Sequence, residues 1–217
     1  MTAARPVLYG YWRSSAAYRV RLALACKGLA YDSLPVDLRI GAQGSDDYRA
    51  RNPQGLVPAL AIDGDVLGQS LAIIEYLEET AGGPALLPTE PLARAHVRAA
   101  AQIIACDIHP INNLRVLRYL KQPLGHDQAT IDAWARHWIT SGLTALETIA
   151  ARHGGLCLFG DTVTIADLCL VPQLYNARRI VTDLAAFPRL TAIDARLATA
   201  EFVMAAHPDA QVDSVAG

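Results

Sequence analysis

The pattern of the chain changes abruptly at residues 82–91, and this change constrains the fold more than any other feature. The segment holds two glycines and three prolines, which typically interrupt secondary structure. Before it, short apolar runs alternate with helical patterns; after it, the patterns are helical. A chain of 217 residues is long enough for two cores. We therefore predict one domain at 1–83, a linker at 84–91 and a second domain at 92–217.

The first domain is expected to be an α/β layer, because its apolar runs predict strands that alternate with helices. Asp63-Gly64 predicts a tight hairpin turn, and Ser70 is placed to cap the helix that follows. Residues 39–50 are predicted as a polar loop with at most one helical turn. The predicted strands are 7–12, 31–38, 57–62 and a short one near Val66, and the predicted helices are 15–27 and a helix that starts at Ser70.

The second domain is expected to be entirely helical, since no stretch in it has a convincing strand pattern. Within it, Pro110 would kink its helix, and Thr164 with Asp167 matches a capping box. The predicted helices are 94–120, 127–152, 164–180 and 188–198.

The composition excludes some classes of partner. Charged residues make up 18% of the chain and the formal charge is only -2, so neither a nucleic-acid nor a membrane surface is expected. No apolar stretch approaches the length of a membrane span, and the first residues lack a signal-peptide pattern. We expect a cytoplasmic protein.

The four cysteines are scattered without a Cys-x-x-Cys pair and are expected to be reduced. Cys106 precedes His109 by three residues, which is compatible with a metal pair or with simple packing. Two ligands alone do not complete a site, so no metal is predicted.

Ser14 and Ser15 lie where the first strand passes into a helix, and the amides and hydroxyls of a helix start favour an anion. A thiolate bound there would be stabilised; a plain helix cap is the alternative. Gln69-Ser70 at the next helix start could receive a carboxylate or act only as a cap. Val57, before Pro58, could pair with an extended peptide ligand if the bond is cis, or mark an ordinary strand entry.

Several side chains are candidates for binding an acidic substrate. Arg13, beside the serines, and Arg178-Arg179, near a helix end, suit bidentate binding of carboxylates, although solvated surface arginines are the alternative. His109, Asn112 and Asn113 flank Pro110, where a kink would turn polar groups toward a cleft or leave them paired within the fold.

Four segments together resemble zeta-class glutathione transferases, a family that includes maleylacetoacetate isomerases. They are WRSSAAYRVRLAL (12–24), NPQGLVPAL (52–60), QSLAIIEYLEE (69–79) and TIADLCLVPQLYNARR (164–179). The resemblance implies an α/β thioredoxin-like N-terminal domain plus an all-α C-terminal domain, the glutathione S-transferase fold. It also implies glutathione as cofactor, a homodimer, and a small cis-enedioate substrate.

The resemblance also assigns roles to residues. Ser14 would stabilise the glutathione thiolate beside Ser15, and Arg179, assisted by Arg13, would engage the acidic substrate. As our own hypothesis, beyond the resemblance, His109 or Asn113 would stabilise the enolate that forms on addition of the thiolate. The remaining glutathione contacts would be Val57 to the cysteinyl backbone, Gln69 and Ser70 to the γ-glutamyl end, His109, and, on a loose alignment, Gln43.

Two departures from the zeta pattern stand out: Ala16 replaces a cysteine, and His109 replaces a glutamine. His-Pro-x-Asn-Asn also resembles maleylpyruvate isomerases, but Leu114 stands where those have arginine. The implied activity is conversion of maleylacetoacetate to fumarylacetoacetate by thiolate addition, bond rotation and elimination, in aromatic amino acid catabolism. Isomerisation of maleylpyruvate, general glutathione transfer, and a non-catalytic interaction module of the same fold are the alternatives.

Overall fold

The computed structural model describes residues 5–180 and 182–214 and consists of two compact units. Unit 1 comprises the chain up to Ala85 together with the residues from Thr199 onward, and unit 2 comprises Leu86–Ala198. The boundary between the units at Ala85 falls within the predicted linker. The sequence-based division differs from these units in one respect, because it assigned the residues after 198 to the helical domain.

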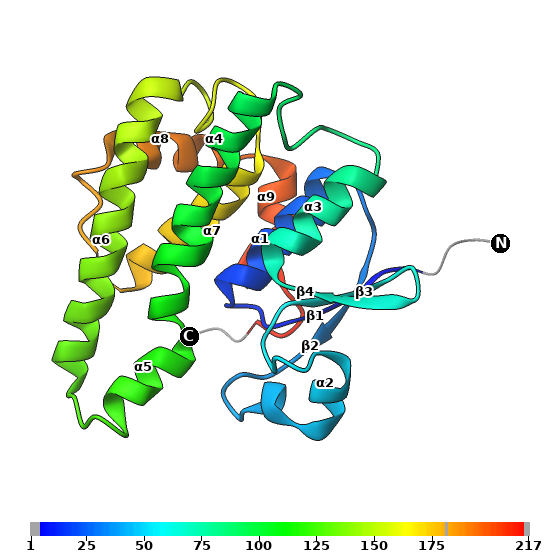
Figure 1. Cartoon of the computed structure of the whole chain (residues 1–217), viewed down its shortest axis with the longest axis vertical. Coiled ribbons are helices and arrows are strands. Elements are labelled where there is room, and N and C mark those ends of the chain that lie inside the picture. The colour runs from blue at the N-terminus through cyan, green and yellow to red at the C-terminus, as the bar shows by residue number, and fades with distance from the viewer. Residues whose placement is uncertain (1–4, 181, 215–217) are drawn as a thin grey trace. The chain divides into compact units, whose positions relative to one another are not determined.

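Unit 1 contains a four-stranded sheet with the order β2-β1-β3-β4 (Figure 1). β1 pairs with β2 in parallel, and β3 pairs with both β1 and β4 in antiparallel orientation. Asp63 and Gly64, between β3 and β4, both have positive φ angles of 52° and 88°, as a tight two-residue hairpin requires. The predicted turn is confirmed. The strands are β1 (Val7–Gly10), β2 (Asp32–Pro35), β3 (Ala59–Ile62) and β4 (Asp65–Gly68).

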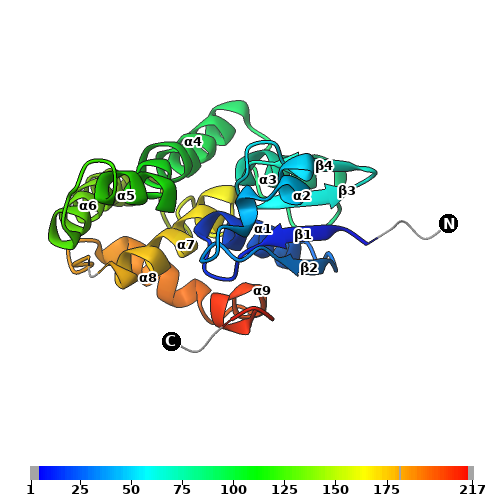
Figure 2. The same cartoon turned by 90° about the horizontal axis from the view of Figure 1, so that it is seen from below.

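Helix α1 is the centre of unit 1 and packs against both α3 and α9 (Figures 1 and 2). Its side chains Ala17, Val20 and Leu24 are fully buried, and Gly28, with φ of 67°, follows its end as predicted. The helical segments of this unit are α1 (Ser15–Cys26), η1 (Ala42–Gly44), α2 (Asp46–Arg51), α3 (Ser70–Thr80), α9 (Glu201–Ala206) and η4 (Pro208–Ala210).

Unit 2 is helical, but the single helix predicted at 94–120 is wrong. The chain forms α4, then a π-helical turn η2, a short η3 and α5. The break begins before Pro110: the N–H of His109 donates to the carbonyl of Ile104 (2.9 Å), the i to i−5 spacing of a π-helix. The segments are α4 (Pro91–Gln102), η2 (Ile103–Ile108), η3 (Pro110–Asn112), α5 (Leu114–Lys121), α6 (Gln128–His153), α7 (Ile165–Arg179) and α8 (Pro188–Leu197).

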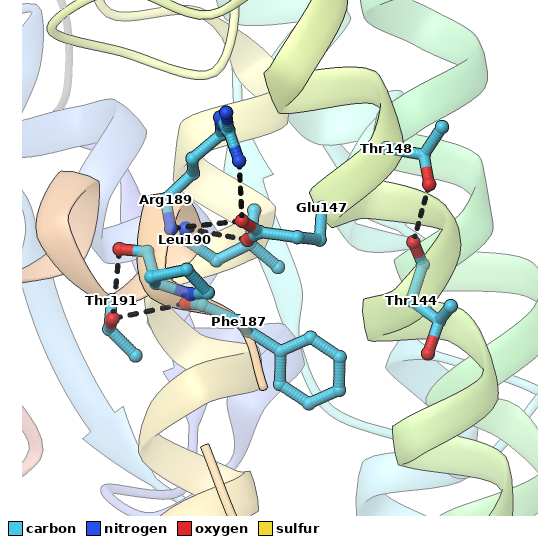
Figure 3. A network of polar contacts seen from close by, with 8 residues as sticks. Thr144, Glu147, Thr148, Phe187, Arg189, Leu190 and Thr191 are labelled. Atoms are coloured by element: carbon cyan, nitrogen blue, oxygen red, sulfur yellow. Dashed lines mark hydrogen bonds and ion pairs between the residues drawn. The ribbon is translucent and has the colours of Figure 1, made fainter. Parts of the chain in front are cut away.

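Two carboxylates of unit 2 hold the starts of helices. The predicted capping box of Thr164 and Asp167 is present at α7, and Asp167, fully buried, also accepts from the N–H of Leu158 (2.8 Å). Burial raises the pKa of Asp167. At α8, Glu147 of α6 accepts from the N–H groups of Arg189 (3.0 Å) and Leu190 (3.1 Å), as Figure 3 shows. The two bonds to Glu147 satisfy amides at the start of α8 that have no partner within their own helix.

No helix within the described residues is long and apolar enough to cross a membrane. The same residues contain no group of three or more histidine, cysteine or acidic side chains arranged to hold a metal ion.

Candidate active site

The turn between β1 and α1 presents Ser14 at the start of the helix. The N–H of Ser14 donates to the carbonyl of Tyr11 (3.0 Å), which closes the turn. Ser14 is the N-cap of α1, and its Oγ accepts from the N–H of Ala17 (3.2 Å). Because this bond uses a lone pair of the hydroxyl, its proton remains to be donated. Ser14 therefore caps the helix and still offers a donor at the positive end of the helix dipole.

The neighbours of Ser14 differ in exposure. Ser15 is buried, at 7% exposed. Arg13 is exposed, and its guanidinium lies 5.0 Å from the centre of the Trp12 ring, a cation–π arrangement. Arg13 thus belongs to the same turn as the two serines.

Ser70 does not cap α3, so that prediction is wrong. Gln69 is the N-cap, with a φ of 64° and no side-chain cap bond. Ser70 is the first helical residue, and its Oγ accepts from Nη1 of the buried Arg19 on α1 (3.2 Å). The guanidinium can only donate, so the proton of the Ser70 hydroxyl remains to be donated to another group.

Arg19 was missed at the sequence level. The signal was available, because Arg19 stands four residues after Ser15 and so lies on the same face of the helix as this serine. The partner, Ser70, is 51 residues away along the chain, and helix periodicity carries no information about such a contact.

Segment 52–58 is fixed by bonds to one carbonyl. Nδ2 of Asn52 and Oη of Tyr48 both donate to the carbonyl of Leu56, each at 2.7 Å, which fixes the backbone next to Val57. The Val57–Pro58 peptide bond is cis. Segment 52–58 is also tied to the start of α3, since Nε2 of Gln69 donates to Oε1 of Gln54 (2.7 Å).

Gln43 lies in η1, close to segment 52–58. A side-chain carbon added to Gly55 would lie 3.1 Å from the backbone oxygen of Gln43, so glycine permits this close approach. Among the described residues, the side-chain Oε1 of Gln43 is buried without a hydrogen-bond partner. Buried amide oxygens are normally paired, so this atom is suited to accept an N–H from a ligand.

Three candidate residues of unit 2 lie in or at the ends of short elements. His109 joins η2 to η3, and Asn113 is the N-cap of α5, where its Oδ1 accepts from the N–H of Arg115 (3.2 Å). Asn112 donates to the carbonyl of Ile108 (3.0 Å), while its own Oδ1 is buried without a partner among the described residues.

The two arginines at the end of α7 have different surroundings. Nη2 of Arg178 lies 2.6 Å from Oδ2 of Asp194 on α8, so Arg178 links two helices. Arg179 is the last residue of α7 and is exposed. Helix α7 packs against η2, which places Arg179 and His109 on neighbouring elements.

Comparison with known proteins gives consistent matches. The protein-family model of the glutathione S-transferase N-terminal domain matches residues 8–85. The chain is 52% identical to the maleylacetoacetate isomerase of Rhizobium meliloti, over 94% of this chain and 96% of that one. It is 47% identical to a maleylpyruvate isomerase of a Ralstonia species, over 95% and 99%.

Solved structures give matches of the same kind. The holo structure of maleylpyruvate isomerase, described as a bacterial zeta-class glutathione S-transferase, superposes with a TM-score of 0.94 at 46% identity, covering 96% of this chain and all of that one. This chain belongs to the zeta class of the glutathione S-transferases. The structure of the maleylacetoacetate isomerase of Methylobacterium extorquens, with bound malonate and GSH, has a TM-score of 0.93 at 42% identity, covering 97% of this chain and 100% of that one. The predicted family and fold class are confirmed.

Proposed function

We propose that this zeta-class chain is a glutathione-dependent cis–trans isomerase that converts maleylacetoacetate to fumarylacetoacetate. The observation that carries the proposal is the Ser14 hydroxyl, held by the N–H of Ala17 so that its proton is free to be donated at the start of α1. The 52% identity to a maleylacetoacetate isomerase supports this choice of substrate.

The residues of unit 1 fit glutathione in their chemistry. The hydroxyl oxygens of Ser14 and Ser70 each accept a hydrogen bond from another residue. The proton of each hydroxyl therefore remains to be donated to an anionic group. The buried, unpartnered Oε1 of Gln43 suits an amide N–H of a tripeptide. Val57 would pair with the cysteinyl backbone, while Gln69, with Ser70, would hold the γ-glutamyl end.

When bound, glutathione supplies a nucleophilic sulfur that adds reversibly to the cis double bond and so permits rotation. The task of Ser14 is to donate a hydrogen bond to that sulfur, and the dipole of α1 further favours its ionised form. Ser15 supports the same helix start. Together these groups keep the sulfur reactive near neutral pH.

On the substrate side, Arg179 and Arg13 would bind carboxylate groups, since guanidinium matches carboxylate geometry. Negative charge develops on the substrate's carbonyl oxygen during the reaction and needs a donor. The Oδ1 of Asn113 is used in capping α5, which leaves its Nδ2 group to donate. His109, four residues before it in the chain, is the second candidate, and its ring could also contact glutathione.

Maleylpyruvate is the second candidate substrate, favoured by the TM-score of 0.94 and 46% identity to a maleylpyruvate isomerase. Leu114, where that group has arginine, favours maleylacetoacetate. General glutathione transfer by the same sulfur would consume glutathione, whereas isomerisation would not. A non-catalytic interaction module would not need these hydroxyls.

We further propose that the enzyme acts as a cytoplasmic homodimer in aromatic amino acid catabolism. The resemblance to zeta-class enzymes supports this setting. Sedimentation of the purified protein tests the dimer directly.

The test compares maleylacetoacetate with maleylpyruvate, with and without glutathione, for wild type and Ser14→Ala. Wild type should isomerise maleylacetoacetate faster, only with glutathione and without consuming it. Loss of one donor of this kind should lower turnover by about 100-fold. Ser33→Ala, a substitution in β2, is the matched control and should leave the rate unchanged. Equal rates for wild type and Ser14→Ala would contradict the proposal.

A further inference from the structure

The C-terminal segment is joined by hydrogen bonds to the turn that carries Ser14. The backbone N–H and the backbone carbonyl of Trp12 are the two groups of the turn that take part. The N–H of Trp12 donates to Oδ2 of Asp213 (2.9 Å). The carbonyl of Trp12 accepts from Nη2 of Arg21 (2.9 Å), and Nε of the same arginine donates to the carbonyl of Ala206 (3.0 Å). Residues about 200 positions apart in the chain are thereby joined.

The geometry of the turn explains why Trp12 needs these partners. The turn is closed by the bond from Ser14 to Tyr11, which leaves the polar backbone atoms of Trp12 outside it. Trp12 is only 5% exposed, and buried backbone groups require hydrogen-bond partners. Asp213 and Arg21 supply them.

The segment that presents Asp213 is itself ordered by local contacts. Nε2 of Gln211 donates to the carbonyls of Ala205 (3.1 Å) and His207 (2.9 Å). The ring of His207 lies 6.1 Å from that of Tyr18, edge to face, and α9 packs along α1. Asp213 is therefore held in place and can act as a fixed acceptor.

We propose that Asp213 is a positioning residue for the isomerase reaction. It acts through the backbone of Trp12, two residues before Ser14, and fixes the turn so that the Ser14 hydroxyl is aimed at the sulfur. This inference rests on the function proposed above. It also gives the residues after α9 a part in catalysis without contact with substrate.

The hydrogen bond, and not the charge, is the essential property of Asp213. The guanidinium of Arg39, whose hydrogen bond with Asp37 raises its pKa, also experiences the charge of Asp213, so a role for the charge has to be tested separately. Asp213→Asn removes the charge and keeps an oxygen that can accept from Trp12. Asp213→Ala removes both.

The experiment measures kcat, KM, the pKa of the glutathione thiol in the complex, and amide hydrogen exchange of the turn. Asp213→Ala should lower kcat roughly tenfold, since small misplacements of a catalytic group are costly. It should also raise the thiol pKa and speed exchange at Trp12. Asp213→Asn should stay within about twofold of wild type. Val212→Ala, which changes an exposed side chain in the same segment, is the matched control and should match wild type.

Three outcomes would overturn the inference. The inference would be overturned if Asp213→Ala had the kcat and the thiol pKa of wild type. It would also be overturned if kcat fell equally in the alanine and asparagine variants, because the charge of Asp213 would then be the property that matters. Unchanged amide hydrogen exchange at Trp12 in Asp213→Ala would overturn the inference even if the protein had no isomerase activity. A wild type that fails to bind glutathione would instead refute the proposed function. If Asp213→Ala does not fold, Asp213→Glu, which displaces the acceptor and keeps the charge, should show the same direction of change.

Discussion

The two units use their buried polar contacts differently. In unit 1 these contacts converge on the candidate site: Arg19 bonds Ser70, Arg21 bonds Trp12, and Asn52 fixes the carbonyl before Val57. In unit 2 the buried Asp167 and the carboxylate of Glu147 hold the starts of α7 and α8. Its candidate residues lie instead at the ends of helices or in irregular segments.

This difference suggests a division of tasks. A hydrogen-bonded surface such as that of unit 1 would suit a constant ligand such as glutathione. Substrate preference can change more readily where side chains stand at helix ends and in π-helical or 3₁₀ turns, since loops and irregular segments tolerate variation. Unit 2 has these features around His109, Asn113 and Arg179. Three variants of unit 2 test the division.

The largest effect is expected for Asp167→Ala, which would leave the N–H groups of Leu158 and Thr164 without their acceptor. Each unpaired buried group costs about 1–3 kcal/mol, so the free energy of unfolding should fall by about 3 kcal/mol. Chemical denaturation measures this. Asp161→Ala, which removes one exposed bond to Leu156, should cost less. A large change in substrate preference in Asp167→Ala would contradict the division of tasks between the two units.

A smaller effect, limited to substrate binding, is expected for Arg179→Ala. Loss of a charged bond to a carboxylate should raise KM for the diacid by about 10- to 100-fold, while KM for glutathione should not change. Arg178→Ala is the matched control, since Arg178 is paired with Asp194, and it should affect stability more than KM. Equal losses with a neutral electrophile would argue against a carboxylate-binding role for Arg179.

The smallest effect concerns the pH dependence of folding stability, which a carboxylate of unit 2 influences. Hydrogen bonds from Thr130 lower the pKa of Asp127, the N-cap of α6. A lowered pKa in the folded state stabilises the protein above the ordinary carboxyl pKa of about 3.9, and this contribution is lost as the pH falls through the folded value. Thermal unfolding should therefore be less sensitive to acid in Asp127→Asn than in wild type. Asp127→Ala should be less stable at every pH; an unchanged acid sensitivity in both variants would refute the role.

Local features of the fold could be predicted from the sequence. The Asp63-Gly64 turn, the helix start at Ser14 and the capping box of Thr164 and Asp167 each depend on residues within four positions of one another. Short-range geometry determines such features, so spacing was sufficient. The same holds for the end of α1 at Gly28.

Long-range features could not be predicted in this way. The Ser70 hydroxyl was expected to cap its own helix, but it bonds Arg19, which only the packing of α1 on α3 brings near. The π-helical turn at Ile103–Ile108 starts before Pro110. The residues from Thr199 belong to unit 1 because α9 packs on α1, a contact that periodicity within α9 does not reveal.

The central claim is that the start of α1 holds the sulfur of glutathione as a thiolate through Ser14. The most direct measurement is an ultraviolet titration of thiolate absorbance for glutathione bound to wild type and to Ser14→Ala. Wild type should lower the thiol pKa from about 8.5 to about 7, and Ser14→Ala should return it toward the free value. A bound thiol that titrates like free glutathione in wild type, or identically in both proteins, would contradict the account.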